Sequence, residues 1–114
     1  MACRILTLIV IGIALPCFAS DNSKPADSLI QEGIRLFRMR SLSESVATLR
    51  RALQANPTSL EARIYLARAL IQEDRVPEAL REVRILLERF PADPEAQFQA
   101  GRLLQQLSGS RFAR

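Results

Sequence analysis

The side chains of this 114-residue chain that could do chemistry are carboxylates and arginines. The sequence has no histidine, and its two cysteines, Cys3 and Cys17, stand close to the N-terminus. A nucleophile paired with a histidine base, or a metal site built from nitrogen and sulfur, therefore lacks its usual components. The four glycines are dispersed and form no phosphate-binding loop. We expect no enzymatic activity, no cofactor and no metal.

The most closely spaced carboxylates lie between Glu73 and Glu88. Neighbouring carboxylates such as Glu78 and Glu82 can act as a general acid and base. Here they alternate with arginines at helical spacing, which is typical of a solvated helix face with ion pairs worth a few tenths of a kcal/mol. The sequence therefore favours a surface role for them over catalysis.

The segment 1–19 has the layout of a secretory signal peptide. Arg4 precedes an apolar run from Ile5 to Leu15, and cleavage is predicted after Ala19. A membrane anchor would need about 20 apolar residues, which is longer than this run. A lipoprotein acylated at Cys17 would need a small residue before the cysteine, where Pro16 stands.

Cleavage predicts an exported protein, and the short leader and abundant arginine favour a bacterial periplasm. A secreted or envelope-anchored protein is the alternative, and contact with a membrane is expected only through an uncleaved leader. Loss of Arg4 leaves 15 basic and 12 acidic residues, well mixed along the chain. Such a balance differs from the concentrated basic stripe of nucleic-acid binders, so no nucleic acid is expected.

From Ala26 onward, apolar residues recur at helical spacing almost without a break. We predict a flexible lead-in over residues 20–25 and a tail over 108–114. Capping boxes beginning at Ser41 and Thr58 are predicted to open two of the helices. The predicted helices run from about Asp27 to Met39, from Leu42 to before Pro57, from the Thr58 capping box through Ala62, Leu66, Ala69 and Leu70, from Pro77 to before Pro91, and from Pro94 to Leu107.

A similar helix occurs twice, as VATLRRALQANP at 46–57 and as LREVRILLERFP at 80–91. Shifting the chain against itself so that Pro57 meets Pro91 superimposes small residues on small ones and large on large ones. This offset, which we call one repeat length, has the period of about 34 residues that is typical of helix–turn–helix repeats. The matching sets are Gly33, Ala67 and Gly101; Leu36, Leu70 and Leu104; Ser45 and Ala79; Leu49 and Val83; Leu53 and Leu87; and Pro57 and Pro91.

With these residues the chain resembles the tetratricopeptide repeat family. The resemblance implies an all-α fold: five helices in antiparallel helix-turn-helix repeats, stacked as an α-solenoid with a right-handed superhelical twist. Leu29, Leu36 and Arg63 replace aromatic residues that the family favours. The expected units are repeat one at 26–59, repeat two at 60–93 and a half-repeat capping helix at 94–107.

Two antiparallel helices approach closely only where their side chains are small. We therefore predict that Gly33 faces Ser45 and that Ala67 faces Ala79. Gly101 is predicted to be a packing position of the same kind in the half-repeat.

The resemblance also implies that the first helix of each pair lines a concave face on which ligands lie. An apolar floor edged by arginines suits an extended or helical peptide with apolar anchors and acidic groups. The residues expected on this face are Ile30, Ile34, Phe37, Arg38, Ile64, Tyr65, Arg68, Ile71, Gln72, Phe98, Gln99, Arg102 and Gln105.

The leading functional hypothesis is an exported adaptor or scaffold that binds a peptide or partner protein, as an accessory of an envelope or secretion assembly. An apolar patch on a small protein also suits self-association, so a homo-oligomeric structural subunit is an alternative. Binding of a membrane surface or a polyanion through the arginines is another. Steep weakening of binding with salt would indicate the last of these.

Overall fold

The computed structural model describes residues 23–112. This part of the chain contains five helices and no strand, which confirms the predicted all-α class. The signal peptide predicted for residues 1–19 lies outside the described residues. Within 23–112 no helix combines the length and apolar character needed to cross a membrane. The helices are α2 (Ser23–Arg38), α3 (Leu42–Ala55), α4 (Leu60–Gln72), α5 (Val76–Arg89) and α6 (Pro94–Phe112).

Two helix ends differ from the prediction. Helix α2 begins at Ser23, so residues 23–25 of the expected lead-in are helical. Pro25 lies in the first turn, where its missing N–H costs no hydrogen bond. Helix α6 continues to Phe112 and takes up most of the expected tail. A glycine inside a helix costs only about 1 kcal/mol relative to alanine, so Gly109 does not end it.

The predicted capping boxes are also wrong in detail. Ser41 is the N-cap of α3, but its side chain makes no capping hydrogen bond. The N-cap of α4 is Ser59, not Thr58, and its hydroxyl accepts a hydrogen bond from the N–H of Ala62 at 3.2 Å. Neighbouring residues that both carry a hydroxyl offer the helix two possible caps, and their sequence alone does not select one.

The turns inside the two helix pairs have the same geometry. Arg40 and Asp74 both have a positive φ, of 66° and 63°. The N–H of Ser41 donates to the carbonyl of Leu36, and that of Arg75 donates to the carbonyl of Leu70, each at 2.9 Å. This is the Schellman arrangement that ends a helix and reverses the chain. The two turns therefore repeat in backbone conformation as well as in sequence position.

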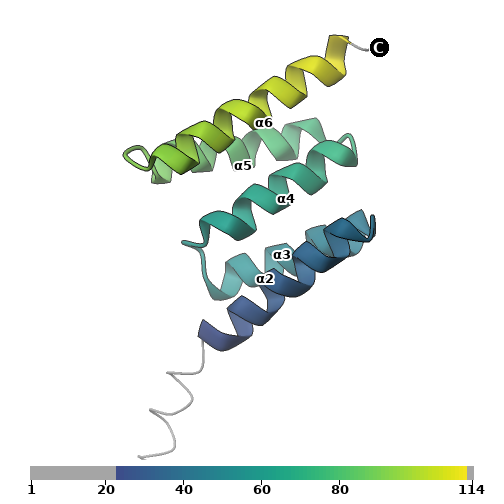
Figure 1. Cartoon of the computed structure of the whole chain (residues 1–114), viewed down its shortest axis with the longest axis vertical. Coiled ribbons are helices and arrows are strands. Elements are labelled where there is room, and N and C mark those ends of the chain that lie inside the picture. Colours follow the sequence, from purple (N-terminus) through teal and green to yellow (C-terminus); the bar gives the residue numbers. More distant parts are fainter. Residues whose placement is uncertain (1–22, 113–114) are drawn as a thin grey trace, which may run out of the picture.

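The helices form two layers (Figure 1). Helices α2, α4 and α6 lie side by side in one layer, since α4 contacts both of the others directly. Helices α3 and α5 form the second layer. Helix α2 packs mainly on α3, whereas α4 packs about equally on α5 and on α3, and α5 also contacts α6. This is the stack of helix pairs that the internal repeat predicts.

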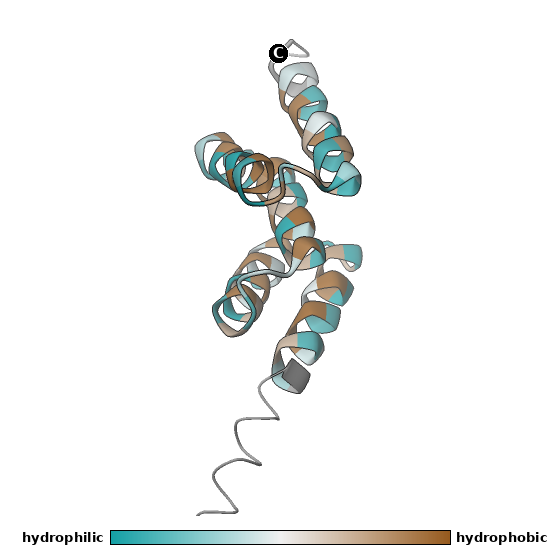
Figure 2. Cartoon of the chain, turned by 90° about the vertical axis from the view of Figure 1, so that its left-hand side faces the viewer, coloured by the Kyte–Doolittle hydropathy of each residue, from teal (hydrophilic) through white to brown (hydrophobic). Residues whose placement is uncertain are grey.

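The core consists of two apolar clusters with α4 between them. The first lies among α2, α3, α4 and α5 and also includes Leu107 of α6, and the second lies among α4, α5 and α6. Figure 2 shows apolar ribbon on the sides of the helices that face their neighbours. Buried members of the first cluster include Ile30, Ile34, Val46, Leu49, Leu66, Leu70 and Ala79. The second contains Ile64, Ala67, Val83, Leu86, Ala100 and Leu103.

Small residues hold the first pair together, as predicted. The buried hydroxyl of Ser45 donates to the carbonyl of Gly33 at 2.7 Å. A Cβ on Gly33 would lie 2.6 Å from Cγ and Cδ2 of Leu49. In the second pair Ala67 is fully buried in the same cluster as Val83, which stands one repeat length after Leu49. The facing of Ala67 by Ala79 stays a prediction, although Ala79 is also fully buried.

Gly101 does not pack as predicted. It is exposed, and a Cβ added there would meet nothing within 4 Å among the described residues. A packing role for Gly101 inside this chain is therefore wrong, because no described helix covers that side of α6.

These two glycines are expected to respond oppositely to Gly→Ala substitution. Gly33→Ala should lower the free energy of unfolding by about 1–3 kcal/mol, because the new methyl group overlaps the buried Leu49 side chain. Gly101→Ala should raise it by up to about 1 kcal/mol through helix propensity alone. Urea denaturation followed by circular dichroism measures both changes. Equal stabilisation by the two substitutions would contradict the close approach of α2 and α3.

Candidate functional site

Two aromatic rings and one arginine form a platform on the first layer. The rings of Phe37 on α2 and Tyr65 on α4 meet edge to face, with centroids 5.5 Å apart and planes at 80°. The guanidinium carbon of Arg68 lies 5.2 Å from the Tyr65 centroid and 5.4 Å from the Phe37 centroid. Tyr65 and Arg68 are three residues apart on α4 and so share a helix face. We call these three residues the aromatic–arginine platform.

The platform leaves the polar edge of Arg68 without a partner. Among the described residues, no hydrogen bond or ion pair engages its guanidinium group. Arg102, which stands one repeat length later on α6, lies 5.9 Å over the ring of Phe98 and has no such partner in residues 23–112 either. Stacking covers the face of a guanidinium and leaves its five N–H donors in the plane. Both arginines can therefore receive a carboxylate without breaking an internal bond.

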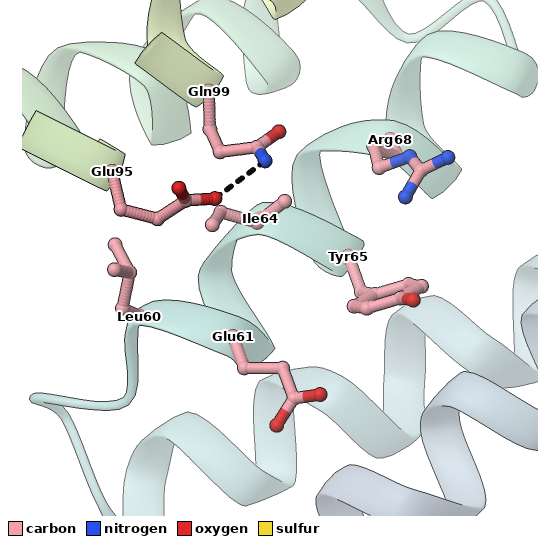
Figure 3. Close-up of a pocket in the computed structure, with 7 residues that line it drawn as sticks. All are labelled: Leu60, Glu61, Ile64, Tyr65, Arg68, Glu95 and Gln99. Carbon is pink, nitrogen blue, oxygen red and sulfur yellow. Dashed lines mark hydrogen bonds between the residues drawn. The ribbon is translucent and has the colours of Figure 1, made fainter. Parts of the chain in front are cut away.

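A pocket of about 360 Å³ opens between α4 and α6, beside the platform (Figure 3). Its apolar part comes from Leu60, Ile64 and the ring of Tyr65. The side-chain amide of Gln99 donates to Glu95 at 2.7 Å. The complete lining is Leu60, Glu61, Ile64, Tyr65, Arg68, Glu95 and Gln99. The volume lies within the range of sites that hold a small ligand or an anchoring side chain.

A smaller hollow lies beside this pocket along α6. It is lined by Arg68, Gln99, Arg102, Leu103 and Gln106. Arg68 and Gln99 line both depressions, so the two are adjacent. We call the pocket and this hollow together the inner groove.

Charge is distributed unequally along the inner groove. Glu61 and Glu95 lie in the first turns of α4 and α6, where carboxylates interact favourably with the helix dipole. Arg68 and Arg102 follow seven residues later on the same two helices. At 1.5 Å per residue this spacing is about 10 Å. The inner groove therefore has an acidic end and a basic end, with apolar surface between them.

The structure brings several predicted site residues together. Phe37, Tyr65 and Arg68 form the platform, and Ile64 and Gln99 line the pocket. Ile64 is itself buried and contributes to the floor. Arg102 lines the adjoining hollow. Phe98, which lies under Arg102, is 60% exposed.

Other predicted residues lie elsewhere. Ile30 and Ile34 are only 5% and 4% exposed, so their expected contact with a partner is wrong. The apolar side of α2 packs them into the first core cluster. The side-chain oxygen of Gln72 accepts a hydrogen bond from Arg40 at 2.8 Å and so forms an internal bridge. Ile71 packs against both clusters, while Arg38 and Gln105 are exposed and line neither depression.

Sequence reasoning missed Leu60, Glu61 and Glu95. A usable signal was present, because Glu61 and Glu95 are themselves one repeat length apart. Each precedes its arginine, Arg68 or Arg102, by seven residues. A comparison of the repeats that uses only apolar residues does not detect that these charged residues also recur.

Two of the carboxylates of α5, Glu78 and Glu82, form ion pairs with arginines of neighbouring helices. Glu78 accepts hydrogen bonds from Arg75 and Arg50, which lower its pKa from the ordinary value of 4.5. Glu82, expected on a solvated face, instead pairs at 2.7 Å with Arg63, whose side chain is buried. Within residues 23–112 no group of three His, Cys, Asp or Glu side chains is placed to hold a metal ion. These acids therefore serve packing.

Residues 36–107 match the family model described as tetratricopeptide repeat. The matched stretch covers more than half of the chain and contains the end of α2, all of α3, α4 and α5, and most of α6. The comparisons with curated proteins and with solved structures found no match. Repeats of this family are typically non-catalytic modules that mediate binding to proteins or peptides. The chain belongs to the tetratricopeptide repeat family.

Proposed function

We propose that the inner groove binds a segment of another protein through one apolar anchor and two flanking charges. The apolar anchor enters the pocket floored by Leu60 and Ile64. A carboxylate of the ligand binds Arg68, and a basic group lies against Glu61. The observation that carries this proposal is the Arg68 guanidinium, fixed against two rings at the pocket edge with no internal acceptor among the described residues.

The spacing of the charges specifies the ligand further. An extended peptide rises about 3.3 Å per residue, so the distance of about 10 Å between the two ends corresponds to roughly three residues. A helical ligand would span the same distance in about seven residues. We therefore expect a short pattern of a basic, an apolar and an acidic residue. Salt does not screen the burial of the apolar anchor, so much of the affinity should remain at physiological salt. Binding of a polyanion through arginines alone would lose most of its affinity under the same conditions.

Peptide display on the purified chain from Ser20 tests this proposal. Selection from random dodecapeptides should enrich the basic–apolar–acidic pattern. Arg68→Glu should weaken the selected peptides about tenfold or more, because a carboxylate would then face a carboxylate. The matched control is Arg89→Glu, an equal charge change at an exposed position in the last turn of α5. Peptides that tolerate Arg68→Glu, or that lose all binding at physiological salt, would contradict the proposal.

The cellular setting proposed for this activity is outside the cytoplasm. The layout of residues 1–19 supports export to a bacterial periplasm, where the partner would belong to an envelope or secretion assembly. Intact mass of the chain recovered from a periplasmic fraction checks this directly. Cleavage after Ala19 gives a chain that begins at Ser20. Recovery of the full chain from the cytoplasm alone would refute export.

A further inference from the structure

The edge of the molecule formed by α5 and α6 is an uncovered copy of a surface that is covered earlier in the chain. Four residues on this edge are exposed: Leu80, Leu87, Gly101 and Leu104. Their counterparts one repeat length earlier are Val46, Leu53, Ala67 and Leu70. Of these counterparts three are buried, and Leu53 packs against the first core cluster. The same surface is thus present twice, once covered and once open.

Helix α5 is the element that covers the earlier copy. Val46 of α3 and Leu70 of α4 share the first core cluster with Ala79 of α5. Arg50 of α3 forms an ion pair with Glu78, in the first turn of α5. Helix α5 therefore packs between α3 and α4 with the small residue Ala79 facing inward, and the acidic residue directly before it, Glu78, pairs with Arg50. Helix α3 carries the same pair as Glu44 and Ser45, and Ser45 bonds to Gly33.

The uncovered copy offers the same contacts. Arg84 of α5 is the counterpart of Arg50, and it is exposed between Leu80 and Leu87 on one face of the helix. No residue of the described chain gives Arg84 a hydrogen bond or an ion pair. Gly101 is the counterpart of Gly33, and space around it is open. Arg84 and Gly101, which have no such contacts within the described chain, are therefore the two points that a covering helix would contact.

The described part of the chain does not supply that helix. After α2 and α4 the chain reverses at Arg40 and Asp74. The corresponding position after α6 is Ser108, which lies inside the helix as it continues to Phe112. An acidic residue directly before a small one occurs in every described helix, and all five helices are already packed in the fold. A second copy could lend one of them only by unfolding.

We propose that the α5–α6 edge receives an amphipathic helix of a partner protein, with a small residue on Gly101 and, directly before it, an acidic residue that pairs with Arg84. Leu80, Leu87 and Leu104 bury the apolar side of that helix. This edge lies on different residues from the inner groove. The proposal therefore stands whether or not the groove binds a peptide.

The test uses a helix-stapled, fluorescein-labelled peptide with the α5 sequence VPEALREVRILLERF (76–90), which carries Glu78 before Ala79. Fluorescence anisotropy should show saturable binding to the folded chain. Gly101→Leu in the protein should weaken binding at least about tenfold, since it fills the position that must stay small. Gly109→Leu is the matched control, because it lies in the same helix with nothing within 4 Å of an added Cβ, and it should leave binding unchanged.

A charge exchange tests the predicted pairing. Arg84→Glu in the protein should weaken binding about fivefold or more, and a peptide carrying Glu78→Arg should restore it. Arg81→Glu, an equal change at another exposed position of α5, should have little effect. Circular dichroism confirms that each variant is folded.

Three results would overturn the proposal. One is an absence of binding up to about 100 μM peptide. Another is binding that depends on Arg50 but tolerates Gly101→Leu, which would mean that the peptide displaces the chain's own α5. The third is a dimer in sedimentation velocity that Gly101→Leu dissociates, which would assign the edge to a second copy.

Discussion

Glu82→Ala is expected to lower the free energy of unfolding by about 3–5 kcal/mol, a large part of the stability of a domain of this size. Glu82 pairs with Arg63 at 2.7 Å, and the two side chains are only 18% and 7% exposed. Arg63 also donates to the carbonyl of Pro57 at 3.0 Å, while its Nε has no partner in the described chain. Removal of the carboxylate would leave a buried cation without its counter-charge, which is the costly part of the change.

Urea denaturation at pH 7 measures this loss, with Glu88→Ala as the matched control. Glu88 is an exposed carboxylate on the same helix, so its removal should change stability by no more than about 0.5 kcal/mol. Replacement of both partners, Arg63→Met with Glu82→Leu, should recover most of the loss, because no buried charge then remains. A cost below about 1 kcal/mol for Glu82→Ala would show that Arg63 is solvated in solution.

Leu70→Ala is expected to cost about 2–5 kcal/mol, whereas Leu104→Ala should cost less than about 0.5 kcal/mol. The two leucines occupy the same position of successive repeats. Leu70 is fully buried and belongs to the first core cluster, but Leu104 is 41% exposed. Truncation leaves a cavity only at Leu70, because solvent already reaches Leu104.

Thermal or urea denaturation of the two variants measures the difference. Both substitutions remove the same atoms and change helix propensity equally, so each serves as the control for the other. Similar losses at both positions would mean that Leu104 is covered in solution. Concentration dependence of the Leu104→Ala effect would then indicate that a second copy supplies the cover.

Much of the fold could be predicted because it depends on local spacing. Apolar residues three and four apart identify each helix, and the repeat length identifies which helices pair. Contact between Gly33 and Ser45 follows from the need for small side chains where helices cross closely. In the inner groove, the shared face of Tyr65 and Arg68 follows from their separation by three residues. Helix ends were less predictable, as the choice between Thr58 and Ser59 shows.

The site was predicted less well because exposure depends on distant elements. Ile34 and Arg68 occupy the same repeat position on α2 and α4, yet Ile34 is buried and Arg68 stacks beside the pocket. Arg63 replaced an expected aromatic residue, and its sequence context gave no sign that it would be buried with Glu82. The burial of Ile34 and of Arg63 depends on the side chains of the helix that packs against each of them, and that helix lies elsewhere in the sequence.

The sequence by itself determined the helices, their repeat and their pairing, since each is recorded in the spacing of residues along one stretch of chain. Only the tertiary structure decided which equivalent positions are covered. Ala67 is buried and Gly101 is open, although both occupy the small position of their repeats. The physical reason is that burial requires a second surface. A periodic pattern specifies the side that a helix offers, but not whether another helix lies against it.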